Sequence, residues 1–112
     1  MGITIEKLNQ FAEKGKENKI LPHLKSKDKQ IRIGAIKALG NCTGGEEGFN
    51  QLTTMMPMTT DKDELIAICD ALGNLGKEQS FYHISHYMDQ VNDPDVIDAM
   101  RKAIAKIRQH HT

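Results

Sequence analysis

The sequence of 112 residues has no tryptophan, and its three Phe and two Tyr residues make up only 4% of the chain. A hydrophobic core must therefore be built mainly from aliphatic side chains and from the six methionines. Cysteine is also scarce. The two cysteines, Cys42 and Cys69, are too few for a disulfide framework or a metal-binding cluster. Both lie within apolar patterns, so we expect reduced and buried thiols.

The chain also lacks an excess of either charge, because 15 Lys and Arg residues balance 15 Asp and Glu residues. This balance argues against nucleic-acid binding, which needs a cationic surface. No apolar run approaches the roughly 20 residues of a membrane span, and the N-terminus lacks the layout of a signal peptide. We therefore expect one cytoplasmic domain that binds neither nucleic acid nor membrane.

A repeated segment is the main pattern in the sequence. Residues 31–42 and 64–75 align without a gap at an offset of 33, and a third copy, 96–107, follows 32 residues later. Small residues four apart on one helix face let a neighbouring helix approach closely, and a large apolar residue beside them fills the remaining space. Each copy is therefore predicted to be an inner helix packed against a partner. The equivalent positions are Gly34, Ala67 and Ala99; Ala38, Ala71 and Ala103; and Leu39, Leu72 and Ile104.

The sequence also indicates where the helices begin and end. Asp61 is followed by Glu64 as in a capping box, and an outer helix is predicted upstream of each inner helix, after a glycine and acidic residues. Pro22 lies in the first turns of its outer helix and is expected not to break it, whereas Pro57 is expected to end or bend the next one. An aspartate suited to an N-cap precedes each inner helix, at Asp28, Asp61 and Asp93.

The expected domain organisation follows from these elements. About seven helices form one domain, residues 1–112, because no unit can bury its apolar face alone. One further possibility is that the chain is a capped piece of a larger array. Polar residues on the last helix nevertheless suit an end that faces solvent, and these are Arg101, Arg108 and Gln109. The predicted parts are an N-terminal capping helix, 1–14, and three repeats, 15–43, 44–75 and 76–112.

These repeats resemble the HEAT-like repeat family, in particular the short bacterial and cyanobacterial lyase-type repeats. The resemblance implies an all-α fold, a right-handed α-α superhelix in the form of a short HEAT-like solenoid. It also implies that Arg32 pairs with acidic groups of a neighbouring unit, although Leu65 and Ile97 take its place in the later copies. The matching residues of the first copy are Asp28, Ile31, Arg32, Ala35, Ala38, Leu39 and Gly40.

The same resemblance implies a non-enzymatic scaffold for protein–protein interaction, because HEAT arrays mostly serve as binding surfaces. The alternative is a subunit or fragment of a lyase-type HEAT-repeat enzyme. HEAT-like hydroxylases hold iron with His-Glu pairs, and no histidine of this chain is followed by Glu. We therefore expect no enzymatic activity and no cofactor. The histidines are His23, His83, His86, His110 and His111.

Two histidines on one predicted outer helix are the main candidate for a metal site. His83 and His86 are three residues apart, so both can face one ion. Asp89 lies only at the edge of this face, and Gln90 is a poor ligand, so a third ligand is not clearly offered. We therefore expect a solvated helix face and no bound metal.

The candidate partner-binding surface lies on the inner helices, at positions four residues apart. If the helices stack, these positions form rows that run across the repeats on the concave side. The middle row, Lys37, Asp70 and Lys102, alternates in charge. One interpretation is a ladder of exposed ion pairs between units, each worth under about 1 kcal/mol. The other is a mixed-charge groove, with apolar spots at Ile33 and Ile66, that receives a protein or peptide partner. The candidate residues are Ile33, Lys37, Asn41, Ile66, Asp70, Asn74, Asp98 and Lys102.

Other surface features bear on possible partners. The first 30 residues carry seven Lys against four acidic residues, while residues 61–90 carry six acidic residues against two Lys. Such uneven charge can steer a partner or a second copy at low salt, although a solvated surface is the commoner explanation. We expect a monomer or a weak homodimer. Met55, Met56 and Met58 surround Pro57 and either fill the core, the commoner role, or form an adaptable binding surface.

Overall fold

Helices account for the regular structure of the computed structural model, which describes residues 2–42 and 45–111. Over these ranges there are seven α-helices, two short 3₁₀ helices and no strands, so the predicted all-α fold is confirmed. The α-helices are α1 (Ile5–Glu13), α2 (Glu17–Ile20), α3 (Lys29–Gly40), α4 (Glu46–Met55), α5 (Lys62–Leu75), α6 (Gln79–Met88) and α7 (Pro94–His110), and the 3₁₀ helices are η1 (Leu21–Lys25) and η2 (Met56–Met58).

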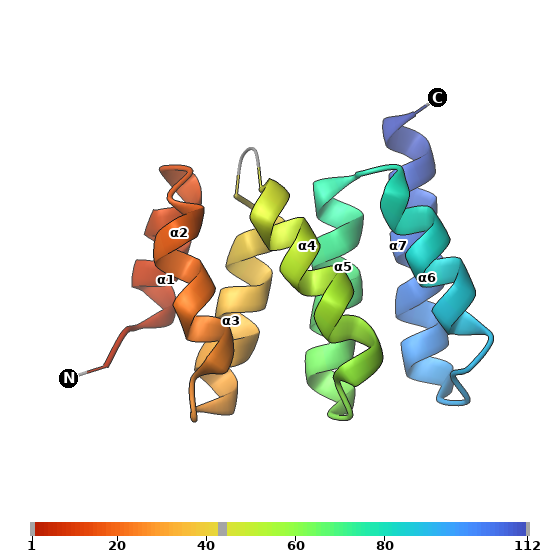
Figure 1. Ribbon diagram of the computed structural model, residues 1–112, viewed down its shortest axis with the longest axis horizontal. Helices are drawn as coiled ribbons and strands as arrows, with labels where there is room; N and C mark the ends of the chain where they lie inside the picture. Colours follow the sequence, from red (N-terminus) through yellow and green to blue (C-terminus); the bar gives the residue numbers. More distant parts are fainter. Residues whose placement is uncertain (1, 43–44, 112) are drawn as a thin grey trace.

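The helices form two layers. Helices α1, α3, α5 and α7 stand side by side in one layer, and α2, α4 and α6 lie across them in a second layer (Figure 1). The most extensive packing joins α3 to α5 and α5 to α7. The layers therefore correspond to the predicted inner and outer helices, and they give the molecule extents of 41 × 30 × 18 Å. The boundary between the repeats predicted at 15–43 and 44–75 lies outside the described residues.

The predicted N-caps are present. The side chains of Asp28, Asp61 and Asp93 each accept a hydrogen bond from a backbone N–H in the first turn of the helix that follows. The Glu64 carboxylate does not return to the backbone of Asp61, as a capping box requires, because it binds Arg32. The capping box is therefore only half formed.

Small residues set the spacing of the inner layer. A Cβ atom added to Gly40 would lie 2.7 Å from the Cα of Ala71, and one added to Gly73 would lie 3.0 Å from the Cα of Ala103. A side chain at Gly40 would therefore overlap the backbone of α5, and one at Gly73 would crowd the backbone of α7. The large apolar residue beside this contact, Leu72, is completely buried, as the repeat pattern predicts.

The two prolines of the outer layer both interrupt α-helix. The expectation that Pro22 leaves its helix unbroken is wrong, because α2 ends at Ile20 and continues only as η1. A proline nitrogen cannot donate the α-helical hydrogen bond, and the chain tightens into 3₁₀ turns instead. Pro57 acts as predicted, since α4 ends at Met55 and η2 follows.

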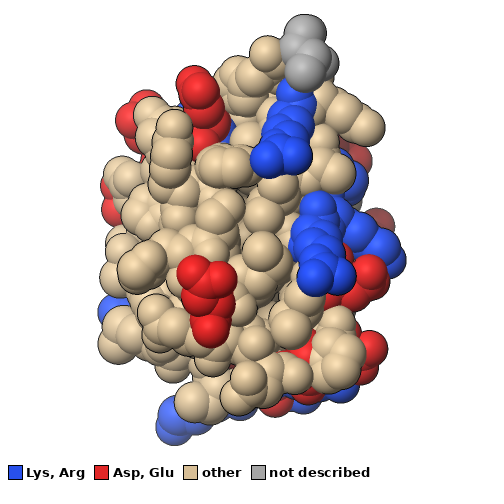
Figure 2. Space-filling view, turned by 90° about the vertical axis from the view of Figure 1, so that its right-hand side faces the viewer, with Lys and Arg blue, Asp and Glu red and all other residues tan. Residues whose placement is uncertain are grey.

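At the end of the molecule formed by α6 and α7, most of the surface is uncharged, with an acidic side chain within it and Lys and Arg side chains along one side (Figure 2). Arg101, Arg108 and Gln109 of α7 are exposed, as expected. The Arg108 guanidinium lies 5.1 Å from the centre of the Phe81 ring, a cation–π contact between α7 and α6. In the part of the chain that is described, no helix combines the length and apolar character needed to cross a bilayer.

Candidate functional site

A hollow of about 320 Å³ lies on the inner layer between α3 and α5. Ile33 and Lys37 line it from α3, and Ile66 and Asp70 line it from α5. The two isoleucines are half-buried, while Lys37 and Asp70 are exposed. Four of the eight predicted contact residues therefore meet at one place, which we call the α3–α5 hollow, and its remaining lining residues are Gln30, Asp63 and Ala67.

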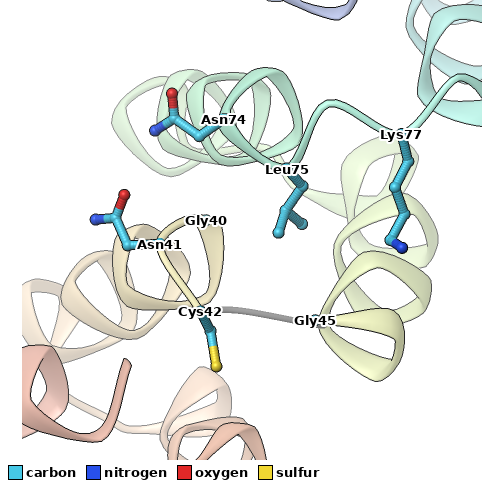
Figure 3. A pocket seen from close by; sticks show the side chains of 7 residues that line it. All are labelled: Gly40, Asn41, Cys42, Gly45, Asn74, Leu75 and Lys77. Atoms are coloured by element: carbon cyan, nitrogen blue, oxygen red, sulfur yellow. The ribbon is translucent and has the colours of Figure 1, made fainter. Parts of the chain in front are cut away.

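Asn41 and Asn74 are brought together elsewhere, at the C-terminal ends of α3 and α5. They line a second hollow of about 490 Å³, with both amides at one edge and Lys77 at the other (Figure 3). The Asn74 Oδ1 atom accepts a hydrogen bond of 2.7 Å from Lys106 Nζ of α7. This amide thus links two inner helices as well as lining the hollow.

The last two predicted contact residues, Asp98 and Lys102, pair with each other along α7. Their charged groups are 3.0 Å apart, and the pKa of Lys102 is raised mainly by this hydrogen bond to Asp98, with a smaller contribution from Asp70. Among the described residues, Lys37 and Asp70 form no ion pair. The interpretation of the middle row as a ladder of ion pairs between units is therefore wrong, because Lys102 pairs with Asp98 of its own helix.

The ion pairs that join successive inner helices lie instead at the helix N-termini. Lys29 Nζ is 2.9 Å from the Asp61 carboxylate and 3.1 Å from that of Asp63. Lys62, the equivalent residue one repeat later, contacts Asp93 at 3.4 Å and also binds Asp95. The sequence signal for this ladder is the Asp-Lys pair at 28–29 and again at 61–62, which the repeat analysis did not use.

This ladder contributes to shifted pKa values at Lys29, Asp61, Lys62 and Asp93. Hydrogen bonds to the aspartates of the next helix raise the pKa values of Lys29 and Lys62. The pKa of Asp61 is lowered first by the backbone N–H of Glu64 and then by Lys29, while that of Asp93 is lowered first by the backbone N–H of Asp95. Asp61 and Asp93 thus each serve as the N-cap of their own helix and as a contact to the preceding inner helix.

The pairing expected for Arg32 is confirmed. Arg32 donates two hydrogen bonds to Glu64, which lies at the start of α5 and is 9% exposed. A third nitrogen of the guanidinium, Nη1, donates to the backbone carbonyls of Ser26 and Lys27. Because all of these contacts hold α3 to its neighbours, Arg32 has a structural role and does not belong to the candidate binding surface.

The two cysteines are buried, while the two histidines of α6 are exposed. Burial, with a smaller contribution from Asp70, raises the pKa of Cys69 to about 12, so its thiol stays protonated near neutral pH. Burial also raises the pKa of Cys42, and both thiols are free and buried, as predicted. His83 and His86 are exposed on α6, and no group of three or more His, Cys, Asp or Glu residues in the described ranges is placed to hold a metal ion.

Comparison of the chain with models of protein families, with curated proteins and with solved structures gave no match. The α3–α5 hollow must therefore be interpreted from its own chemistry. It combines two half-buried aliphatic side chains with Lys37 and Asp70, which form no ion pair within the described ranges, and with Asp63, whose carboxylate contacts Lys29. Such a surface can recognise another chain through apolar contact and paired charges.

Proposed function

We propose that the chain is a short HEAT-like solenoid, a right-handed α-α superhelix, that acts as a non-enzymatic scaffold for a protein or peptide partner. The recurring caps, the repeated small residues and the Arg32–Glu64 pair support the HEAT-like assignment. The observation that carries the binding role is the α3–α5 hollow, where residues from two successive repeats combine. We also propose a cytoplasmic monomer or weak homodimer.

The chemistry of the hollow defines the kind of partner. Lys37 and Asp70 lack ion-pair partners among the described residues, so each can bind a group of opposite charge on another chain. Ile33 and Ile66 offer an apolar floor between them. The partner therefore carries an aliphatic side chain flanked by one acidic and one basic residue, and the paired charges contribute mainly specificity and association rate.

The experiment is affinity purification from the native cell, followed by mass spectrometry, with wild-type chain and a charge-swapped variant, Lys37→Glu with Asp70→Lys. We expect the swap to abolish specific capture while the helical circular dichroism stays unchanged, since both residues are exposed. The control variant, Lys25→Glu with Glu13→Lys, makes the same exchange at exposed positions outside the hollow and keeps the capture.

Two outcomes would contradict the proposal. Equal capture by the wild type and the charge-swapped variant would mean that the hollow makes no contact with the partner. Attachment of a bilin to an acceptor protein by the purified chain would favour the alternative, a subunit or fragment of a lyase-type enzyme.

A further inference from the structure

A groove of about 450 Å³, separate from the two hollows described above, lies in the outer layer between the end of α4 and α6. These two helices are neighbours along the front of the molecule (Figure 1). No Lys, Arg, Asp or Glu side chain lines this groove, although such residues make up 27% of the chain. Both tyrosines of the chain are part of it. Its main lining residues are Pro57, Tyr82, His83, His86, Tyr87 and Gln90.

Pro57 is the local reason for the groove. It ends α4, and the chain turns through η2, so α4 does not continue alongside α6. Nearer the start of α4, the Phe49 and His83 rings meet edge to face with their centres 6.2 Å apart. Beyond that contact the groove opens, and large apolar side chains remain on the surface, with Tyr82 68% exposed and Met58 76% exposed.

The methionines around Pro57 divide between the two roles that the sequence left open. Met56 is 2% exposed and belongs to the core, but it also contributes to the lining of the groove. Met58 lies in η2 and is largely exposed. One methionine therefore fills the core, while another adds flexible apolar surface near an open groove.

The polar side chains of the groove offer hydrogen-bond donors, although their oxygen and ring nitrogen atoms can also accept. Tyr82 and Tyr87 carry a phenol O–H, and Gln90 carries an amide NH₂. Within the described part of the chain, these three side chains form no hydrogen bond. The groove therefore suits a ligand that is apolar, uncharged and rich in hydrogen-bond acceptors.

We propose that the groove binds an uncharged, proline-rich peptide in the polyproline II conformation. Proline rings are apolar, and this conformation leaves each backbone carbonyl exposed as an acceptor, while proline itself has no N–H that would need a partner. Aromatic grooves suit such segments because their conformation is largely preformed, which lowers the entropy cost of binding. A charged peptide fits poorly, because the lining provides no Lys, Arg, Asp or Glu to pair with its charges.

The experiment uses the full chain and a fluorescein-labelled oligoproline of about ten residues, the length that spans several polyproline turns. Fluorescence anisotropy measures affinity, and backbone amide shifts in NMR spectra locate the binding site. We expect saturable binding with shifts at residues 53–57 and 82–90. Tyr82→Ala is expected to weaken binding about tenfold, because an aromatic anchor is lost.

Control variants separate binding from folding. Tyr82 is 68% exposed, so its replacement leaves the core intact. Tyr82→Phe keeps the ring but loses the O–H donor, and we expect its affinity to lie between those of the wild type and Tyr82→Ala. The charge-swapped variant of the α3–α5 hollow is expected to bind oligoproline as the wild type does, so this inference can fail without affecting the proposed function. Three results would overturn the proposal of a proline-rich ligand. They are equal affinity of Tyr82→Ala and wild type, binding that does not saturate, and stronger binding of an acidic or basic peptide of the same length.

Discussion

The Arg32 guanidinium donates two hydrogen bonds to a single oxygen of Glu64, from Nε at 2.9 Å and from Nη2 at 2.6 Å. Glu64 is almost completely buried, so these bonds replace the water that its carboxylate loses on folding. The two residues lie in equivalent turns of α3 and α5, and their contact therefore links one repeat to the next.

Replacement of Arg32 by methionine tests this link. Arg32→Met leaves the Glu64 carboxylate buried without its partner, and we expect a loss of about 1.5 to 3 kcal/mol in the free energy of unfolding. Urea denaturation measures the change. The matched control is Arg101→Met, which alters an exposed arginine of α7 and should change stability by less than about 0.5 kcal/mol. Equal effects in the two variants would rule out a special role for the pair.

Close packing of the inner helices is tested at Gly40. Alanine has the higher helix propensity, yet its Cβ would lie 2.7 Å from the Ala71 backbone, so Gly40→Ala should destabilise the protein by about 1 to 3 kcal/mol. The equivalent residue of α7, Ala105, is exposed. Ala105→Gly therefore measures the effect of helix propensity alone, and we expect it to lower the free energy of unfolding by about 0.5 to 1 kcal/mol. Higher stability of Gly40→Ala in thermal or urea unfolding would contradict the close approach of α3 and α5.

Burial of the repeated leucine is tested at Leu72. This side chain is completely buried, so Leu72→Ala should lower the free energy of unfolding by about 2 to 5 kcal/mol through lost apolar contact and the cavity left behind. Met58→Ala removes an exposed side chain of η2 and should have almost no effect on the same urea unfolding curve. A negligible cost at Leu72 would mean that the repeat alignment is wrong.

The N-cap aspartates predict a specific dependence of stability on pH. The pKa values of Asp61 and Asp93 are lower in the folded chain, so their contribution is present above the ordinary carboxyl pKa of about 3.9 and is lost as the pH falls through the folded values. Asparagine also caps helices but does not titrate as aspartate does.

The corresponding experiment compares wild type with the double variant Asp61→Asn and Asp93→Asn. Urea unfolding near neutral pH and at about pH 3, below the ordinary carboxyl pKa, gives the loss of stability on acidification. We expect this loss to be smaller in the double variant, because two carboxylates that favour the folded state have been removed. An identical loss in both proteins would show that the caps contribute nothing to the pH dependence.

Much of the fold could be predicted from particular residues. The aspartate N-caps, the helix-ending Pro57, the buried Leu72 and the link from Arg32 all depend on local pattern or on the repeat. These features can be predicted from the sequence because side chains at equivalent positions of each repeat have equivalent surroundings. The interruption at Pro22 was not predicted, since the choice between α and 3₁₀ turns depends on a small difference in hydrogen bonding.

The candidate site was predictable only in part. Ile33, Lys37, Ile66 and Asp70 share one hollow, as equivalent positions on adjacent helices should. The partner of Lys102 was not foreseen, because Asp98 in the same helix competes with Asp70 in the neighbouring one. The contacts of Lys29 and Lys62 with aspartates of the next inner helix were not predicted either. A long lysine side chain can reach a residue that is not at the equivalent position of the neighbouring repeat.

Sequence alone determined that this protein is helical, where its inner helices begin and which small residues allow them to pack, because these properties follow from local hydrogen bonding and from the period of the repeat. Tertiary structure alone decided which charges pair and which remain unpaired. It also placed Pro57 of one outer segment and Tyr82 of the next in the lining of one groove, although they are 25 positions apart in sequence. Such pairings depend on distances between helices, which the order of residues along a chain does not contain.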